Sequence, residues 1–187
     1  NRALDKAQGK WVLSLDADEA LSPGLIEEIK QIIFSAAVSS EAYAIKRVSF
    51  FSGKKIRYGD WSADKVVRLF RRLATIRFTP SMVHEHLIGY QRLATLKQVI
   101  FHNTMKDMSQ VLMKLESYSS YGAQLAYQQH KKSSLLKAIG HSFWCFIRGY
   151  LLRLGLLDGR EGFILAISNA LGVFYRYVKL IYLYELG

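Results

Sequence analysis

The chain has little of several features that would point to particular classes of protein. Its 187 residues include one cysteine, Cys145, so no disulfide can form within the chain, and this fits a reducing compartment. Acidic residues are few: 15 Asp and Glu stand against 26 Lys and Arg, which gives a net charge of +11. A chain this basic favours an anionic partner, which can be a nucleic acid, a phosphorylated ligand or an acidic membrane surface.

The sequence also shows no signal peptide and no long uncharged run. The first residue is Asn1 rather than Met, and we expect that a preceding segment is missing. The longest run without charge, residues 162–175, has 14 residues, fewer than the ~18–20 that a bilayer-spanning helix needs. Half of the residues are apolar, so the chain can bury the core of one domain, with or without an appendage.

The chain is organised around residues 10–19, KWVLSLDADE. The stretch begins with a short apolar run, typical of a parallel strand covered on both faces, and it ends with acidic residues. In open α/β sheets, ligands bind beyond the carboxyl ends of such strands. Asp16 and Asp18 are two residues apart, so both carboxylates can face one point and hold Mg²⁺ or Mn²⁺ against a substrate phosphate. The alternative interpretation is a solvated turn or a helix cap.

The hydrophobic pattern predicts helices and strands in mixed order. A helix ends before Gly9, and a second begins with Ser22 as N-cap and Pro23 at its first position. A third helix runs from Asp107 to about His130. The apolar positions expected on the buried sides of the last two helices are Leu25, Ile26, Ile29, Ile32 and Ile33, and Val111, Leu112, Leu115 and Tyr118. The strands are expected at residues 11–15, 42–51, 54–58, 66–70, 75–78, 83–87 and 96–102.

The C-terminal tail, from Lys131 onward, is basic and aromatic. It carries eight Lys or Arg against three Asp or Glu, and these charges alternate with Phe, Trp and Tyr. Helices of this composition can lie in the membrane interface. Two ordinary core helices are the other interpretation, and the sequence leaves both open.

Two further clusters could carry chemistry. Residues 83–86, VHEH, place Glu85 between His84 and His86, but Ile88 stands where the H-E-x-x-H zinc motif needs its second histidine. These histidines can equally have structural roles. The second cluster consists of Arg68, Arg71, Arg72 and Arg77, with Asp64 before them. It is basic enough to hold phosphates. For Arg71 and Arg72 a solvated face is the default interpretation.

Several of these motifs, taken in order, resemble family 2 glycosyltransferases of the GT-A fold, and in particular the branch of lipopolysaccharide core glucosyltransferases. The matching segments are residues 1–4 (NRAL), 9–19 (GKWVLSLDADE), 64–72 (DKVVRLFRR), 83–85 (VHE), 146–150 (FIRGY) and 155–162 (GLLDGREG). The resemblance implies an α/β fold. Residues 1–105 would be the C-terminal portion of a GT-A, Rossmann-like nucleotide-sugar transferase sheet without its N-terminal nucleotide-binding strands. Residues 106–187 would form a helical, membrane-associating tail.

The resemblance also implies how the donor is held. Asp16 and Asp18 would be the D-x-D element that binds Mg²⁺ or Mn²⁺, with Asp18 the stronger candidate for direct contact. His84 would be a third metal ligand. Arg68 would add a second positive charge at the diphosphate of a nucleotide sugar, expected to be a UDP-sugar.

The family transfers its sugar with inversion, in one displacement. A carboxylate base must take the proton of the acceptor hydroxyl, and Glu85 is the first candidate and Asp64 the second. Because the first strands are lacking, we expect this chain alone to present half a donor site and to turn over poorly.

The acceptor implied by the resemblance is a lipid-linked glycan, in lipopolysaccharide core biosynthesis. The enzyme would be cytoplasmic and peripheral on the inner face of the cytoplasmic membrane, where anionic lipid attracts the basic tail. No nucleic-acid partner is expected, because the basic residues are scattered among apolar segments and no reading motif is present. The alternative is a non-catalytic peripheral membrane or partner-binding module.

Overall fold

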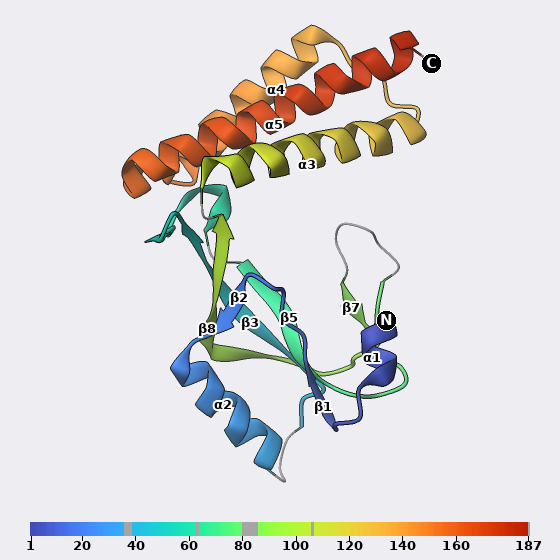
Figure 1. Ribbon diagram of the computed structural model, residues 1–187, viewed down its shortest axis with the longest axis vertical. Coiled ribbons are helices and arrows are strands. Elements are labelled where there is room, and N and C mark those ends of the chain that lie inside the picture. The colour runs from blue at the N-terminus through green and yellow to red at the C-terminus, as the bar shows by residue number, and fades with distance from the viewer. Residues whose placement is uncertain (36–38, 63, 80–85, 106, 187) are drawn as a thin grey trace. The chain divides into compact units, whose positions relative to one another are not determined.

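In the computed structural model the chain forms two compact units (Figure 1). The sheet unit contains Asn1–Val48 and Ala63–His102, and the helical unit contains Ser49–Ser62 and Asn103–Gly187. The structure describes residues 1–35, 39–62, 64–79, 86–105 and 107–186. From the sequence we expect one boundary, after residue 105, which places residues 49–62 in the first region. In the structure these residues belong to the helical unit.

The described strands form one main sheet and one small one. In the main sheet the order is β1-β5-β3-β8-β2, with β4 paired to β3, and β6 pairs with β7. The strands are β1 (Trp11–Leu13), β2 (Glu19–Leu21), β3 (Ala42–Phe51), β4 (Lys54–Lys55), β5 (Asp64–Arg71), β6 (Arg77–Phe78), β7 (Leu87–Ile88) and β8 (Leu93–Met105). The expected strand at residues 83–87 falls mostly outside the described residues, and β2 was not expected.

The expectation that residues 11–15 form a parallel strand covered on both faces is wrong for the pairing that the structure describes. Strand β1 is antiparallel to β5, with Leu13 opposite Leu69, and it lies at one end of the strand order. Its three residues are only partly buried, and Leu15 beyond it is 39% exposed. A short apolar run has the same sequence pattern whichever way its neighbour runs, so the pattern alone could not decide the direction.

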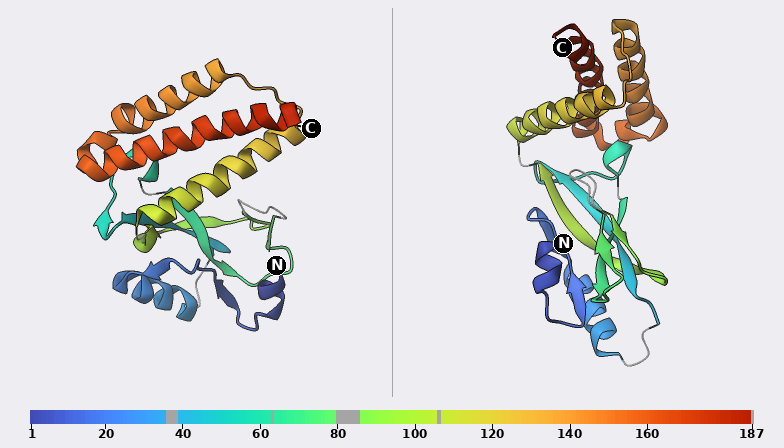
Figure 2. Two further views of the ribbon diagram at one scale, coloured as in Figure 1. Left: turned by 45° about the horizontal axis from the view of Figure 1, so that its top comes forward. Right: turned by 90° about the vertical axis from the view of Figure 1, so that its right-hand side faces the viewer.

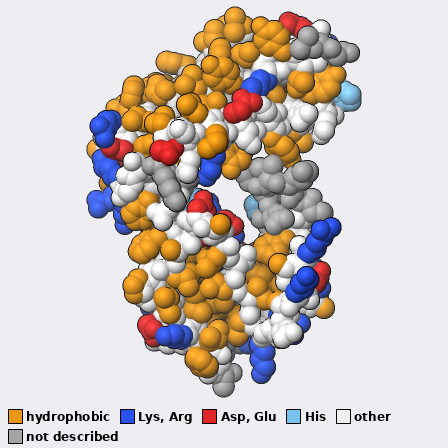
Figure 3. Space-filling view, in the orientation of Figure 1, with side chains coloured by type: hydrophobic (Ala, Val, Ile, Leu, Met, Phe, Trp, Pro, Cys, Tyr) orange, Lys and Arg blue, Asp and Glu red, His pale blue; other side chains and the backbone are white. Residues whose placement is uncertain are grey.

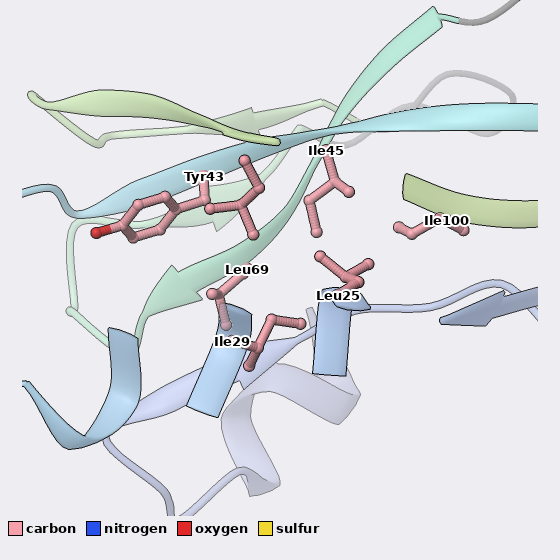
Figure 4. Close-up of a cluster of buried hydrophobic side chains, with 7 residues drawn as sticks. Leu25, Ile29, Tyr43, Ile45, Leu69 and Ile100 are labelled. Atoms are coloured by element: carbon pink, nitrogen blue, oxygen red, sulfur yellow. The ribbon is translucent and has the colours of Figure 1, made fainter. Parts of the chain in front are cut away.

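Helix α2 (Pro23–Phe34) covers the core of the sheet unit. Ser22 caps the helix as expected, because its Oγ accepts a hydrogen bond from the Leu25 amide at 3.3 Å. Leu25 and Ile29 point from the helix toward apolar side chains of the sheet (Figure 4). Burying two such side chains contributes about 1.5–3 kcal/mol each. The apolar face is narrower than expected, because Ile26 and Ile33 are 40% and 38% exposed.

The helical unit is built on three long helices. They are α3 (Met108–Gln128), α4 (Leu135–Ile147) and α5 (Gly159–Leu186), and α5 lies between the other two and contacts both (Figure 2). Asp107 caps α3 as expected, accepting from the Gln110 amide at 3.0 Å, and the helix ends two residues before the expected His130. Leu112 and Tyr118 are each 58% exposed, so their expected burial is wrong.

A buried carboxylate ties the start of α5 to the loop after β4. Asp158 closes the short segment η3 (Gly155–Asp158), is 5% exposed, and accepts hydrogen bonds from the amides of Arg57 and Tyr58 at 3.0 and 2.8 Å. A buried carboxylate is costly unless such donors satisfy it. Asp158, in the matching segment 155–162, therefore has a structural role within this unit.

The helical unit exposes a large amount of apolar surface. By length and composition Gly155–Glu185 is apolar enough to cross a membrane, and 22% of its most apolar part is buried. The search for an uncharged run of ~18–20 residues missed this segment, because Glu161 and Arg176 interrupt it. On α4, one face carries Leu136, Ile139 and Phe143, exposed by 80%, 51% and 66%. On the face drawn in Figure 3, hydrophobic side chains (orange) cover much of this unit. These features suggest membrane association.

Candidate functional site

The acidic stretch after β1 forms a tight turn that ends in a strand. The Glu19 amide donates to the Asp16 carbonyl oxygen at 3.0 Å, and the Asp16 amide donates to Glu19 Oε2 at 3.1 Å. Strand β2 then begins at Glu19, which lies opposite His102 of β8. The turn is therefore closed by two reciprocal hydrogen bonds, and the acidic residues belong to a defined structure rather than to a loose loop.

Glu19 is the centre of a group of charged side chains that we call the acid–arginine cluster, consisting of Asp16, Glu19, Arg47, Asp64 and Arg68. The side chain of Glu19 has no exposed surface. Its Oε1 accepts from Arg68 Nη2 at 2.7 Å and from Arg47 Nη1 at 3.4 Å. Arg68 Nη2 also donates to Asp16 Oδ2. Both guanidinium groups are mostly buried, with Arg68 13% and Arg47 21% exposed, so the carboxylates compensate charges that have lost much of their water.

A β-bulge brings Arg68 into this cluster. On β3, Tyr43 and Ala44 are neighbours, but on β5 they pair with Leu69 and Val67, so Arg68 is the extra residue. A bulge of this kind redirects a side chain and breaks the alternation of faces. Val67 and Leu69 accordingly lie on different sides of the sheet: Val67 packs in one core cluster with Phe70, and Leu69 packs in the other.

Asp64, the second candidate for catalytic base, is paired with Arg47. Arg47 donates from Nε to Asp64 Oδ1 at 3.0 Å and from Nη2 to Asp64 Oδ2 at 2.7 Å, a two-pronged pair that suits the planar guanidinium. Burial lowers the pKa of Arg47, but the hydrogen bonds and charges of Asp64 and Glu19 outweigh it and hold the pKa above its ordinary value. Asp64 remains 52% exposed.

Asp18 contacts a histidine that the sequence analysis did not single out. His102 Nε2 lies 3.3 Å from Asp18 Oδ2, and the exposed fractions of the two side chains are 12% and 39%. Burial lowers the pKa of His102 and the nearby charge of Arg47 lowers it further, against the opposing effect of Asp18. The imidazole is therefore held neutral near pH 7, which leaves it able to act as a nitrogen ligand.

The expected metal ligands are only partly described. Asp16 and Asp18 have different partners, Arg68 and His102, and within the described ranges no group of three His, Cys, Asp or Glu lies close enough to hold a metal ion. The expected ligand His84 and the expected base Glu85 lie outside the described residues. Mg²⁺ and Mn²⁺ take carboxylate oxygens as ligands in proteins, so Asp16 and Asp18 fit the ion by their chemistry, and the metal site stays a prediction.

Three members of the site were missed in the sequence: Glu19, Arg47 and His102. Arg47 carried a signal, because it interrupts an apolar strand on the face shared by Tyr43 and Ile45, and a charge on a core face needs a partner. Glu19 and His102 carried none, since only strand pairing brings them opposite each other.

The other arginines of the predicted phosphate-binding cluster have separate partners. Arg71 lies over the ring of Trp11 at 5.2 Å, and Arg72 Nε donates to the Gly9 carbonyl oxygen at 2.9 Å. Arg77 donates to the carbonyl oxygen of Ile76. Arg68 is the member of this group that binds Asp16 and Glu19 of the acid–arginine cluster.

The chain is similar to several rickettsial proteins named as glycosyltransferases. Uncharacterized glycosyltransferase RP128 of Rickettsia prowazekii (strain Madrid E) is 28% identical over 179 residues, which cover 91% of this chain and 61% of the relative. RT0209 of Rickettsia typhi is also 28% identical with the same coverage, and RC0292 of Rickettsia conorii is 27% identical over 64% of its length. No model of a known protein family matches the chain. The chain thus spans about three fifths of the length of these relatives.

Proposed function

We propose that this chain is part of an inverting, metal-dependent glycosyltransferase of family 2, with a GT-A fold, that moves a sugar from a nucleotide donor to a lipid-linked glycan. The observation that carries the proposal is the acid–arginine cluster, in which the Arg68 guanidinium binds both Asp16, in the turn after β1, and the buried side chain of Glu19. The rickettsial relatives support the reaction class.

The donor diphosphate is held by Asp16, Asp18 and Arg68. The two carboxylates hold Mg²⁺ or Mn²⁺, and when bound, the ion neutralises the charge that develops on the departing diphosphate. Arg68 adds a fixed positive charge, which Glu19 keeps in place from its buried side. Asp16 is 53% exposed, so its ion pair with Arg68 can open and let the guanidinium bind a phosphate oxygen. A UDP-sugar is the donor we infer.

The catalytic base takes the proton of the acceptor hydroxyl as its oxygen bonds to the sugar carbon and the bond to the diphosphate breaks. Glu85 is the first candidate and Asp64 the second. Both oxygens of Asp64 accept hydrogen bonds from Arg47, so an acceptor hydroxyl would have to share this carboxylate with the guanidinium group. This agrees with the order that the resemblance implies, with Glu85 ahead.

The acceptor and the location follow from the helical unit and from the resemblance to lipopolysaccharide core enzymes. The exposed apolar face of α4 and the excess of Lys and Arg in the tail suit the interface of an anionic leaflet. We infer a peripheral protein on the cytoplasmic face of the membrane, working on a lipid-linked glycan of the lipopolysaccharide core.

A direct assay is metal-dependent transfer of radiolabelled sugar from a nucleotide sugar by the full-length protein. The variants Asp18→Asn and Glu85→Gln should each lower kcat/KM roughly 100-fold or more, because each removes charge stabilisation or proton transfer. The matched control is Asp5→Asn, a 59% exposed carboxylate paired with Arg77, which should leave the rate unchanged.

The second candidate is a non-catalytic membrane module, favoured by the exposed apolar surface of the helical unit. It predicts that Asp18→Asn and Asp5→Asn behave alike and that no nucleotide sugar is consumed. Vesicle binding would then remain as the activity of the chain.

A further inference from the structure

A basic cavity lies in the helical unit, and its lining includes none of the residues so far assigned a role. Its volume is about 540 Å³, within the range of roughly 300–1,000 Å³ typical of sites for small molecules. It is lined by the C-terminal half of α3, the segment joining α3 to α4, the first two turns of α4 and the C-terminal half of α5. All of these elements belong to one compact unit.

The lining has an unusual balance of charge. Lys131, Lys132, Lys137 and Arg176 all line the cavity together with His141, and no Asp or Glu is among the described lining residues. Four like charges around one space repel each other, and the repulsion is relieved when an anion enters.

The cationic residue on α5 is held in place by its neighbours. The Arg176 guanidinium carbon lies 4.9 Å from the centre of the Tyr177 ring, and the ring of His141 stacks on the same tyrosine at 4.8 Å. The stem of Arg176 passes so close to Gly122 of α3 that an added Cβ would come within 2.8 Å of Arg176 Cδ. A side chain at Gly122 would force the Arg176 stem to move, so the glycine lets the arginine lie this close to α3.

Negative groups of α3 near its C-terminal end and at Glu116 already have partners. The last carbonyls of α3 are already paired: Leu125 accepts from the Gln129 amide at 3.1 Å, and Ala126 accepts from the Lys131 amide at 3.0 Å. Glu116, a carboxylate of α3, binds Lys179, whose Nζ lies 2.5 Å from its Oε2. The cavity therefore presents cations with little competing negative charge.

We propose that this cavity binds a ligand that carries a phosphate or diphosphate group. Phosphate oxygens are multivalent acceptors that match several Lys and Arg donors at once. The apolar and aromatic remainder of the lining leaves room for a less polar portion of the same ligand. The inference does not depend on sugar transfer, because phosphate binding is measured without any donor.

The test is calorimetric titration of the full chain with inorganic pyrophosphate. The triple variant Lys131→Gln, Lys132→Gln, Lys137→Gln removes three exposed charges from the rim and should weaken binding at least roughly tenfold. The control has the same loss of charge at exposed lysines that do not line the cavity: Lys30→Gln, Lys55→Gln, Lys97→Gln. Unchanged melting temperatures verify that both variants fold.

The proposal holds if pyrophosphate binds the parent and the control alike and the cavity variant binds weakly. Equal weakening in both triple variants, or no binding by the parent, overturns it. Vesicles of phosphatidylcholine with and without phosphatidic acid separate the two sources of phosphate. If pyrophosphate displaces the protein from vesicles, the cavity binds the phosphate of a lipid. If the protein binds vesicles, is not displaced by pyrophosphate and binds no pyrophosphate in solution, the proposed site is contradicted.

Discussion

Glu19 holds Arg68 from a position that water does not reach. Its Oε1 accepts from Arg68 Nη2 at 2.7 Å, and its side chain has no exposed surface. The same oxygen also accepts from Arg47, so one carboxylate compensates two guanidinium groups from neighbouring strands. This arrangement links stability and function, because the residue that fixes the arginine is part of the core of the sheet.

Changing Glu19 to Gln should destabilise the sheet unit strongly. The substitution keeps the shape of the side chain but removes its charge, which leaves two mostly buried guanidinium groups undercompensated. We expect a loss of about 3 kcal/mol in the free energy of unfolding, measured with urea. The control Glu27→Gln breaks an exposed ion pair with Lys30 and should cost less than about 0.5 kcal/mol. Equal effects would mean that the cluster is not the source of stability.

Gly162 should be intolerant of any side chain. A Cβ there would lie 1.9 Å from the Gly155 carbonyl oxygen, and backbone cannot yield that far. Gly162→Ala should therefore destabilise the helical unit by at least about 3 kcal/mol in thermal or chemical unfolding. Gly140 is also in a helix but has open space around it, so Gly140→Ala should stabilise by about 0.5–1 kcal/mol. A tolerated Gly162→Ala would show that α5 does not pack on η3 as described.

Acid should weaken the helical unit through Glu161. A hydrogen bond from Lys54, at 2.6 Å, and one from the backbone lower the pKa of Glu161 from 4.5 to about 2. The unfolded chain therefore binds more protons between these values, so stability contributed by this group is present above pH 4.5 and is lost as the pH falls toward 2. Urea midpoints measured across this range should fall less steeply in Glu161→Gln than in the parent, whereas Glu27→Gln should keep the slope of the parent.

The exposed face of α4 should carry membrane binding. Phe143 is 66% exposed beside Ile139 on this face, so Phe143→Ser should lower partitioning onto anionic vesicles roughly tenfold. Phe34 at the end of α2 is 81% exposed and provides the same chemical change in the sheet unit. If Phe34→Ser reduced sedimentation with vesicles as much as Phe143→Ser does, the effect would reflect general hydrophobicity rather than this surface.

Arg68 should need its guanidinium fork as well as its charge. Arg68 Nη2 makes the contacts with both Glu19 and Asp16, and Arg68→Lys keeps one positive charge but offers a single nitrogen for these carboxylates and a phosphate together. We expect a loss of roughly tenfold or more in kcat/KM for the donor. Arg77→Lys, which changes a part-exposed arginine elsewhere in the sheet unit, is the control. Equal losses would remove Arg68 from the donor site.

Local signals in the sequence predicted much of the fold. Strand β3 was predicted with its observed bounds, and the caps at Ser22 and Asp107 were right, because capping depends on residues close together in the chain. Strand β2 was missed because it is short and begins at an acidic residue. The direction of β1 was wrong because pairing is a tertiary property.

The sequence named some charged residues of the candidate site and missed Glu19 at its centre. Asp16, Asp18, Asp64 and Arg68 came from motifs, and the structure brings Asp16 and Arg68 together. The bulge that redirects Arg68, and the pairing of β2 with β8 that sets Glu19 against His102, depend on contacts between distant segments. No periodicity in the sequence encodes them.

The most direct test of the donor site is to measure by calorimetry the binding of UDP to the full-length protein, with and without Mn²⁺. We expect UDP to bind tightly only with Mn²⁺, and Asp18→Asn to weaken the metal-dependent binding roughly 100-fold while Asp5→Asn leaves it unchanged. Mn²⁺-dependent binding that is the same in Asp18→Asn as in the parent would contradict the assignment of this acidic turn to the donor diphosphate.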